Sequence, residues 1–150
     1  MFRVVRTAAL LAVLASLLAL PAVANASSAQ KRMLDRVNAV RAHHGLKPFR
    51  FASSLSHSAK RYSQTMMSRD YFGHSSSIHA SRRFRSLGEI IEYHRGKRAR
   101  VGSALRSWMR SPSHRSVILS SHFRFAGAGF TRGSFGGRGS TIWVMHVGRR

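Results

Sequence analysis

Three polar side chains lie beside apolar segments of this sequence, and their types suit metal binding or proton transfer. They are His74, Glu89 and His114. A polar group next to apolar sequence needs a hydrogen-bonding reason to be buried there. Two imidazoles and a carboxylate suit an open zinc site whose remaining position holds water, and imidazole titrates in the range that general acid–base catalysis needs. No two of the three are spaced four apart on one helix, so each histidine could equally be an ordinary hydrogen-bonded or solvated group.

A serine hydrolase triad is a second chemistry that these residues suggest. Ser76 or Ser111 would be the nucleophile, acting with His114 and Glu89. The chain has no Gly-x-Ser-x-Gly segment, which forms the turn that exposes the nucleophile in α/β-hydrolases. We therefore assign no catalytic residue from the sequence.

Helical periodicity predicts most of the elements that must position these groups. Apolar residues recur at spacings of three and four in several segments. The expected helices run from Met33 to before Gly45, from an N-cap at Ser53 or Ser54 to near Asp70, from Val101 to Ser111, and from Pro112 to about Leu119. Gly45 suits a left-handed C-cap, and Ser111 suits the N-cap of the last helix. Ser111 and His114 should therefore lie at the start of a short helix.

The last third of the chain changes to an alternating pattern, which predicts strands. Residues 123–130 and 141–147 are the two clear strands, and the glycine-rich segment 133–139 should join them as an antiparallel hairpin. Residues 88–93 suit a short strand or an extended turn. Helices followed by a hairpin, without βαβ repeats, indicate an α+β domain.

The N-terminus has the organisation of a secretory signal peptide. Arg3 and Arg6 precede an apolar run over residues 8–20, and small residues at alternate positions end at Ala26. The alternative, an uncleaved anchor, is disfavoured because the run is shorter than the ~20 residues that span a membrane. We predict a signal peptide over 1–26 with cleavage near Ala26, a short disordered lead over 27–32, and one domain over 33–148.

The charge of the chain limits its partners. The net charge is +22, only four residues are acidic, and there is no cysteine. The absence of cysteine excludes disulfides and thiolate metal sites, and so few acids nearly exclude a multi-carboxylate cation site. A charge of this size attracts nucleic acid, phospholipid headgroups or an anionic wall polymer. Export would leave a charge of +20 outside the cell, which favours cell-wall polymer or lipid over nucleic acid. The basic run from Arg82 to Arg100 is a candidate docking patch, or alternatively a solvated loop.

The motifs, taken in order, resemble a bacterial, cysteine-free member of the CAP superfamily, the domain shared by cysteine-rich secretory proteins, venom antigens and plant pathogenesis-related proteins. The matching segments are residues 34–41, 44–49, 55–66, Tyr71-Phe72-Gly73-His74-Ser75, Gly88-Glu89, Trp108 to Arg115 with Ile118-Leu119, 123–129, and Trp143-Val144. The resemblance covers nearly the whole predicted mature chain.

The resemblance implies an α-β-α sandwich, with a small central antiparallel sheet flanked by helices, and a cleft where His74, Glu89 and His114 meet. It implies that His74 and His114 can hold a divalent metal such as zinc, with Glu89 orienting a metal-bound water. It also implies small apolar ligands or wall components as partners. Two positions depart from the family pattern: Ser111 replaces a second glutamate, and Ile90 replaces an asparagine.

These observations predict a secreted binding or structural module of the cell exterior, with a His/Glu cleft and a basic surface that docks on anionic envelope material. The alternative is an extracellular metal-dependent hydrolase that uses the same cleft. Glu92 is three residues from Glu89, so on a strand it should face the opposite side and could not replace the missing glutamate.

Overall fold

The computed structural model describes residues 21–150, with side chains from Ser28 onward. Most of the predicted signal peptide, residues 1–20, lies outside the described residues. In chain order the elements are α1 (Pro21–His43), β1 (Arg50–Phe51), α2 (Ser53–Ser68), β2 (Ser86–Arg95), α3 (Val101–Arg110), α4 (Pro112–Ile118), β3 (Phe125–Phe135) and β4 (Arg138–Arg149). Within residues 21–150, every helix is too short or too polar to span a bilayer.

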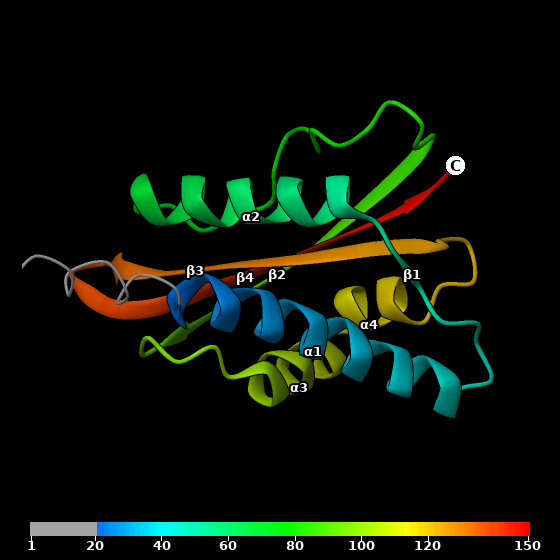
Figure 1. Ribbon diagram of the computed structural model, residues 1–150, viewed down its shortest axis with the longest axis horizontal. Coiled ribbons are helices and arrows are strands. Elements are labelled where there is room, and N and C mark those ends of the chain that lie inside the picture. The colour runs from blue at the N-terminus through cyan, green and yellow to red at the C-terminus, as the bar shows by residue number, and fades with distance from the viewer. Residues whose placement is uncertain (1–20) are drawn as a thin grey trace, which may run out of the picture.

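The elements form three layers, which confirms the predicted α-β-α sandwich. The sheet has the strand order β1-β3-β4-β2, and Figure 1 shows α2 on one face of it and α1, α3 and α4 on the other. Neighbouring strands are antiparallel except at the edge, where the two-residue strand β1 pairs in parallel with β3. Strand β1 was not predicted, since two residues are too few to show an alternating pattern.

The predicted disordered lead is wrong for the part that the structure describes. Residues 27–32 belong to α1, and Ala29 is 2% exposed. Ala29 lies four residues before Met33 and eight before Val37, so it continues the apolar face of the helix. The helix ends as expected, because Gly45 follows with a φ of 68°. The cleavage site near Ala26 stays a prediction.

Helix α2 lies unusually close to β3, and glycine makes this approach possible. A Cβ on Gly127 or Gly129 would be 2.2 Å from a backbone nitrogen of α2. The Ser56 hydroxyl donates to the Ala128 carbonyl across the same contact, at 2.7 Å. The contact fixes the helix from which the loop that carries His74 departs. The N-cap of α2 is Ala52, without a side-chain hydrogen bond, so the predicted cap at Ser53 or Ser54 is wrong.

The hairpin is longer than predicted. Strands β3 and β4 pair antiparallel from Phe125 opposite Gly148 to Phe135 opposite Arg138. The connection is therefore only Gly136 and Gly137, both with positive φ, instead of the whole of segment 133–139. Two consecutive residues with positive φ form the turn that matches the twist of a hairpin. Residues 88–93 likewise belong to a full ten-residue strand, β2.

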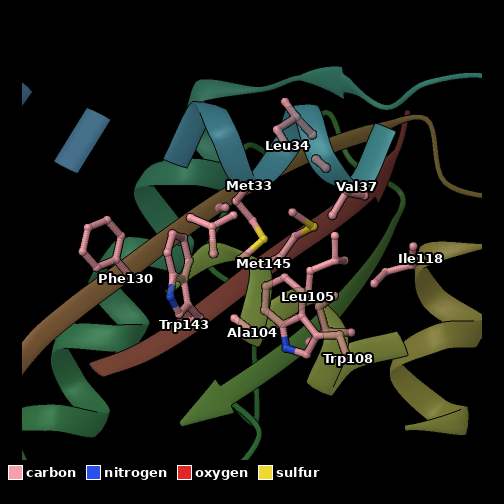
Figure 2. Packing of buried hydrophobic residues seen from close by; sticks show 14 of the residues in the cluster. Met33, Leu34, Val37, Ala104, Leu105, Trp108, Ile118, Phe130, Trp143 and Met145 are labelled. Atoms are coloured by element: carbon pink, nitrogen blue, oxygen red, sulfur yellow. The ribbon is translucent and has the colours of Figure 1, made fainter. Parts of the chain in front are cut away.

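The main hydrophobic core lies between the sheet and the layer of α1, α3 and α4. Trp108 and Trp143 are both fully buried in it, as predicted. Figure 2 shows side chains of α1, α3, α4 and the sheet interdigitating around these two rings. A second cluster, including Ala59, Met66 and Ile91, lies under α2 on the opposite face. The two faces of β2 therefore belong to different cores, and Glu89 lies on the α2 side.

Candidate functional site

The structure places Glu89 at the centre of a hydrogen-bonded cluster on the α2 face of the sheet. Its strand, β2, pairs with β4 so that Glu89 lies directly opposite His146. The Glu89 side chain is 5% exposed. Its Oε1 accepts from His74 Nδ1 at 2.9 Å and from the Ser75 backbone N–H at 2.8 Å. Its Oε2 accepts from the Ser75 hydroxyl and from His146 Nε2, both at 2.9 Å. Four donors therefore occupy the acceptor positions of the two carboxylate oxygens.

His74 lies in the long loop that connects α2 to β2. The Tyr62 hydroxyl of α2 donates to the Gly73 carbonyl at 2.6 Å and anchors the loop one residue before the histidine. The His74 side chain is 58% exposed, although its Nδ1 is held by Glu89. Because Nδ1 carries the proton in this bond, a neutral ring presents Nε2 as a free lone pair.

His114 lies near the start of α4, and the structure brings its ring beside that of His74. The ring centroids are 6.1 Å apart, with the planes tilted by 59°. Burial, reinforced by the nearby imidazole of His74, lowers the pKa of His114 below its ordinary value. The three side chains named by the sequence analysis thus form one chain of neighbours: His114 beside His74, and His74 bonded to Glu89.

The hydrogen bonds also set the charge of Glu89. Burial by itself would raise the pKa of this carboxyl, but the donors from His146, Ser75 and His74 outweigh burial and lower the pKa to about 2. An anion that is this stable and accepts four hydrogen bonds is a weak base near neutral pH. In this arrangement the Glu89 carboxylate holds His74, Ser75 and His146 in place.

His146 is the residue of the cluster that sequence reasoning missed. It is 1% exposed and donates from Nε2 to Glu89, while its Nδ1 has no hydrogen-bond partner in the described part of the chain. The signal was present in the sequence, because His146 interrupts the apolar run of a strand, where a polar group needs a partner. Only the register of β2 against β4 identifies that partner as Glu89.

The two histidines fit a divalent metal site in part. A ligating histidine commonly donates its second N–H to a carboxylate, as His74 does to Glu89. A metal also requires neutral imidazole, which the lowered pKa of His114 favours. The described residues contain no group of three or more His, Asp or Glu side chains that could hold a metal ion. The protein would thus supply His74 and His114, and Glu89 would hold His74 from behind the site. Zinc binding stays a prediction.

The two departures from the family pattern have structural counterparts. Ile90 is fully buried in the main core, on the face of β2 opposite Glu89. Ser111 is the N-cap residue of α4, as predicted, but its side chain makes no cap bond to the helix. Its hydroxyl lies 3.2 Å from that of Ser113 instead. Glu92 bonds to His94, 3.0 Å away and two residues along β2. It faces away from Glu89, as predicted.

A cavity lies between α1, β1 and the start of α2, away from the Glu89 cluster. Its volume is about 410 Å³, and Leu34, Phe51 and Ala128 are among its lining residues. Neither His74 nor His114 lines it. The predicted binding of a small apolar ligand stays a prediction.

Comparison with known proteins identifies the class to which this fold and cluster belong. Residues 34–147 match the CAP family, described as the cysteine-rich secretory protein family. The chain belongs to this family. It is similar to the uncharacterized protein YkwD of Bacillus subtilis (strain 168), with 30% identity over 133 residues, covering 83% of this chain and 48% of that protein. The chain thus spans about half the length of that relative.

Solved structures show the same fold. An extracellular protein of Bacillus anthracis that contains an SCP domain superposes with a TM-score of 0.65 and 21% identity, covering 83% of this chain and 41% of that one. An outer surface protein of Borrelia burgdorferi superposes with a TM-score of 0.67 and 17% identity, covering 82% of this chain and 93% of the other. At these identities the comparison supports the fold.

Proposed function

We propose that this protein is a secreted binding or structural module of the cell exterior. Its basic surface would dock on anionic envelope material, and its His74–Glu89–His114 cleft would face a partner. The predicted signal peptide supports export, as do the extracellular and outer-surface descriptions of the two solved relatives.

One observation carries the docking proposal: no described arginine side chain forms an ion pair with an aspartate or glutamate. All four acids of the chain have other partners, because Asp35 pairs with Lys31, Asp70 accepts from the Gly136 backbone, and Glu89 and Glu92 bind histidines. Every arginine from Arg32 onward is exposed except Arg41. The acidic residues of the chain therefore do not neutralise its exposed arginines, and this positive surface attracts polyanions.

The geometry favours an extended partner over a small anion. The basic run predicted as one patch is divided by β2, with three cations before the strand and four at its last residue or beyond it. The first group is Arg82, Arg83 and Arg85, and the second is Arg95, Lys97, Arg98 and Arg100. Ten residues of strand separate the two groups by roughly 30 Å. A polymer or a membrane surface can contact both groups at once, whereas a small ligand cannot.

One end of the sheet gathers four arginines, two within strands β1 and β4 and two directly before β3 and β2. The Arg50 backbone donates to the Arg124 carbonyl, Arg124 to Gly148, and Arg85 to Arg149. Because neighbouring strands are about 4.8 Å apart, this arginine row is roughly 15 Å wide. We infer that the arginine row (Arg50, Arg124, Arg149 and Arg85) is the main contact with envelope material.

Vesicle binding tests the docking proposal. The purified protein should sediment with phosphatidylglycerol vesicles and wall preparations at about 0.05 M salt, and should be released near 1 M, where the screening length is ~3 Å. The triple variant Arg85→Gln/Arg124→Gln/Arg149→Gln should bind at least tenfold more weakly, since each cation near an anionic surface contributes about 1 kcal/mol. Arg36→Gln/Arg106→Gln/Arg110→Gln, which removes the same charge elsewhere, should bind within about threefold of wild type. Equal binding at both salt concentrations would refute the electrostatic docking.

The hydrolase alternative is not favoured by the site. In that alternative Glu89 acts on a metal-bound water, and the Glu89 carboxylate already accepts four hydrogen bonds from the protein.

A further inference from the structure

Three aromatic side chains lie side by side at the end of the sheet where β2 and β3 finish. Phe72 comes from the loop after α2, Tyr93 from β2, and Phe135 from the last position of β3. The ring centroids of Phe72 and Tyr93 are 6.0 Å apart, and those of Tyr93 and Phe135 are 5.0 Å apart. Phe72 is 40% exposed, and the other two are partly buried against the cluster under α2. These three residues, the aromatic row, therefore belong to the surface of the protein.

Hydrogen bonds around the aromatic row hold its segments together. The Asp70 carboxylate accepts from the Gly136 backbone N–H, which fastens the loop of Phe72 to the turn that follows Phe135. The Tyr62 hydroxyl donates to the carbonyl of the residue after Phe72, at 2.6 Å, and fixes the other side of that residue. A surface that is ordered in advance loses less conformational entropy when a partner binds.

Two exposed arginines flank the aromatic row. Arg95 follows Tyr93 by two residues on β2, so the two side chains lie on the same face of the sheet. Arg138 lies directly opposite Phe135 across the hairpin, and directly opposed residues also share a face. Both arginines are exposed, and neither forms an ion pair with an acid of the described residues. The surface therefore suits a partner that combines anionic groups with flat apolar faces.

These features favour an acidic sugar chain over a bilayer. The face of an aromatic ring is electronegative, so it attracts the C–H groups on the flat side of a sugar ring. Figure 1 shows the hairpin between β3 and β4 at the opposite end of the sheet from the C-terminus, and the arginine row lies at the C-terminal end. A flat membrane that contacts the arginine row would therefore not reach the aromatic row, whereas a long polysaccharide can contact both.

We propose that the aromatic row binds an acidic polysaccharide, whose sugar rings stack on Phe72, Tyr93 and Phe135 and whose anionic groups pair with Arg95 and Arg138. This inference rests on the proposed docking, because it identifies the envelope material as an acidic glycan. It also gives a role to the cations at the end of β2, which the arginine row does not include.

Titration of the purified protein with a galacturonate tetrasaccharide, followed by NMR of the aromatic rings, tests the proposal. The ring signals of Phe72 and Tyr93 should shift saturably. Maltotetraose has four sugar rings without carboxylates, and N-acetylated, amidated tetraglutamate has four carboxylates without sugar rings, so each should bind at least tenfold more weakly. Phe72→Ala should weaken tetrasaccharide binding about fivefold. Phe51→Ala removes a ring that is 62% exposed in β1, at the arginine-row end of the sheet, and should leave binding within twofold.

Several results would overturn this inference. Tetraglutamate that binds as tightly as the tetrasaccharide would mean that charge alone explains binding, and an equal loss in Phe72→Ala and Phe51→Ala would exclude stacking on the aromatic row. Ring signals that no probe moves would also overturn it. A loss of vesicle binding in Phe72→Ala would place the ring in a membrane instead. The triple variant of the arginine row separates this inference from the proposed docking, since it should lose vesicle binding and keep tetrasaccharide binding within about threefold.

Discussion

Replacing Glu89 by glutamine removes the charge at the centre of the cluster while keeping the side chain nearly the same size. The wild-type carboxylate accepts four hydrogen bonds, two of them from histidines. Lowering a pKa from 4.5 to about 2 corresponds to about 3 kcal/mol of stability at neutral pH. Allowing for solvent screening, we expect Glu89→Gln to destabilise the fold by about 2 kcal/mol, or roughly 6–10 °C in Tm.

The pH dependence of the stability difference between wild type and Glu89→Gln tests the role of the charge more sharply. A carboxyl whose pKa is lowered by folding contributes its full stability above the unfolded pKa of 4.5, and loses it as the pH falls toward 2. Urea unfolding at pH 7, 5 and 3 should therefore show a gap between wild type and Glu89→Gln that is constant above pH 5 and narrows at pH 3. Asp35→Asn, which breaks only an exposed ion pair with Lys31, should change stability by less than about 0.5 kcal/mol. A gap of the same size at pH 3 and pH 7 would refute the assigned role of the charge.

Four further predictions follow from other contacts. Arg41→Met should lower the free energy of unfolding in urea by about 3 kcal/mol. The Arg41 side chain is fully buried, donates to the carbonyls of Lys47, Ile118 and Ser120, and stacks over the Phe49 ring. As a control, Arg124→Met at an exposed position should lower it by less than about 0.5 kcal/mol. Gly129→Ala should destabilise by about 3 kcal/mol or more, because its Cβ would meet the backbone of α2, and an unchanged Tm would contradict the close approach. The bond to Glu92 and a second bond to the Arg98 carbonyl raise the pKa of His94 despite burial. The contribution of His94 to the free energy of unfolding should therefore be complete below pH 6.5 and should fall as the pH rises through the pKa of the folded state. His94→Gln should flatten the dependence of Tm on pH between pH 5 and 9. Zinc titration by calorimetry should give one site that His74→Ala or His114→Ala abolishes; a stoichiometry unchanged in both variants would rule out the two-histidine site.

Much of the fold could be predicted from the sequence, because it depends on periodicity. The helix over Val101 to Arg110 and the pairing of the last two strands follow from apolar spacing alone. The early start of the folded region was missed because Ala29 contributes little apolar area to a periodic pattern, although it packs beside Met33. The N-cap at Ala52 was missed because the start of α2 is set by its contact with β3 and not by a capping side chain.

The candidate cluster was only partly predictable. The resemblance to the CAP family pointed to His74, Glu89 and His114, and the structure shows the contacts among them. Sequence spacing could not reveal that His146 closes the cluster from the adjacent strand, since cross-strand neighbours depend on register. Nor could it show that β2 divides the basic run, because residues 88–93 were ambiguous between a strand and a turn.

The bonds to Glu89 have a consequence for how the loop before β2 is held. In a family named for its cysteines, this chain has none, and a single carboxylate fastens the loop through His74 and both donors of Ser75. Reductants do not break these hydrogen bonds, and the bonds form without an oxidising compartment. The bonds are broken by protons instead, so we expect strong acid to free the loop under conditions in which a disulfide would still hold.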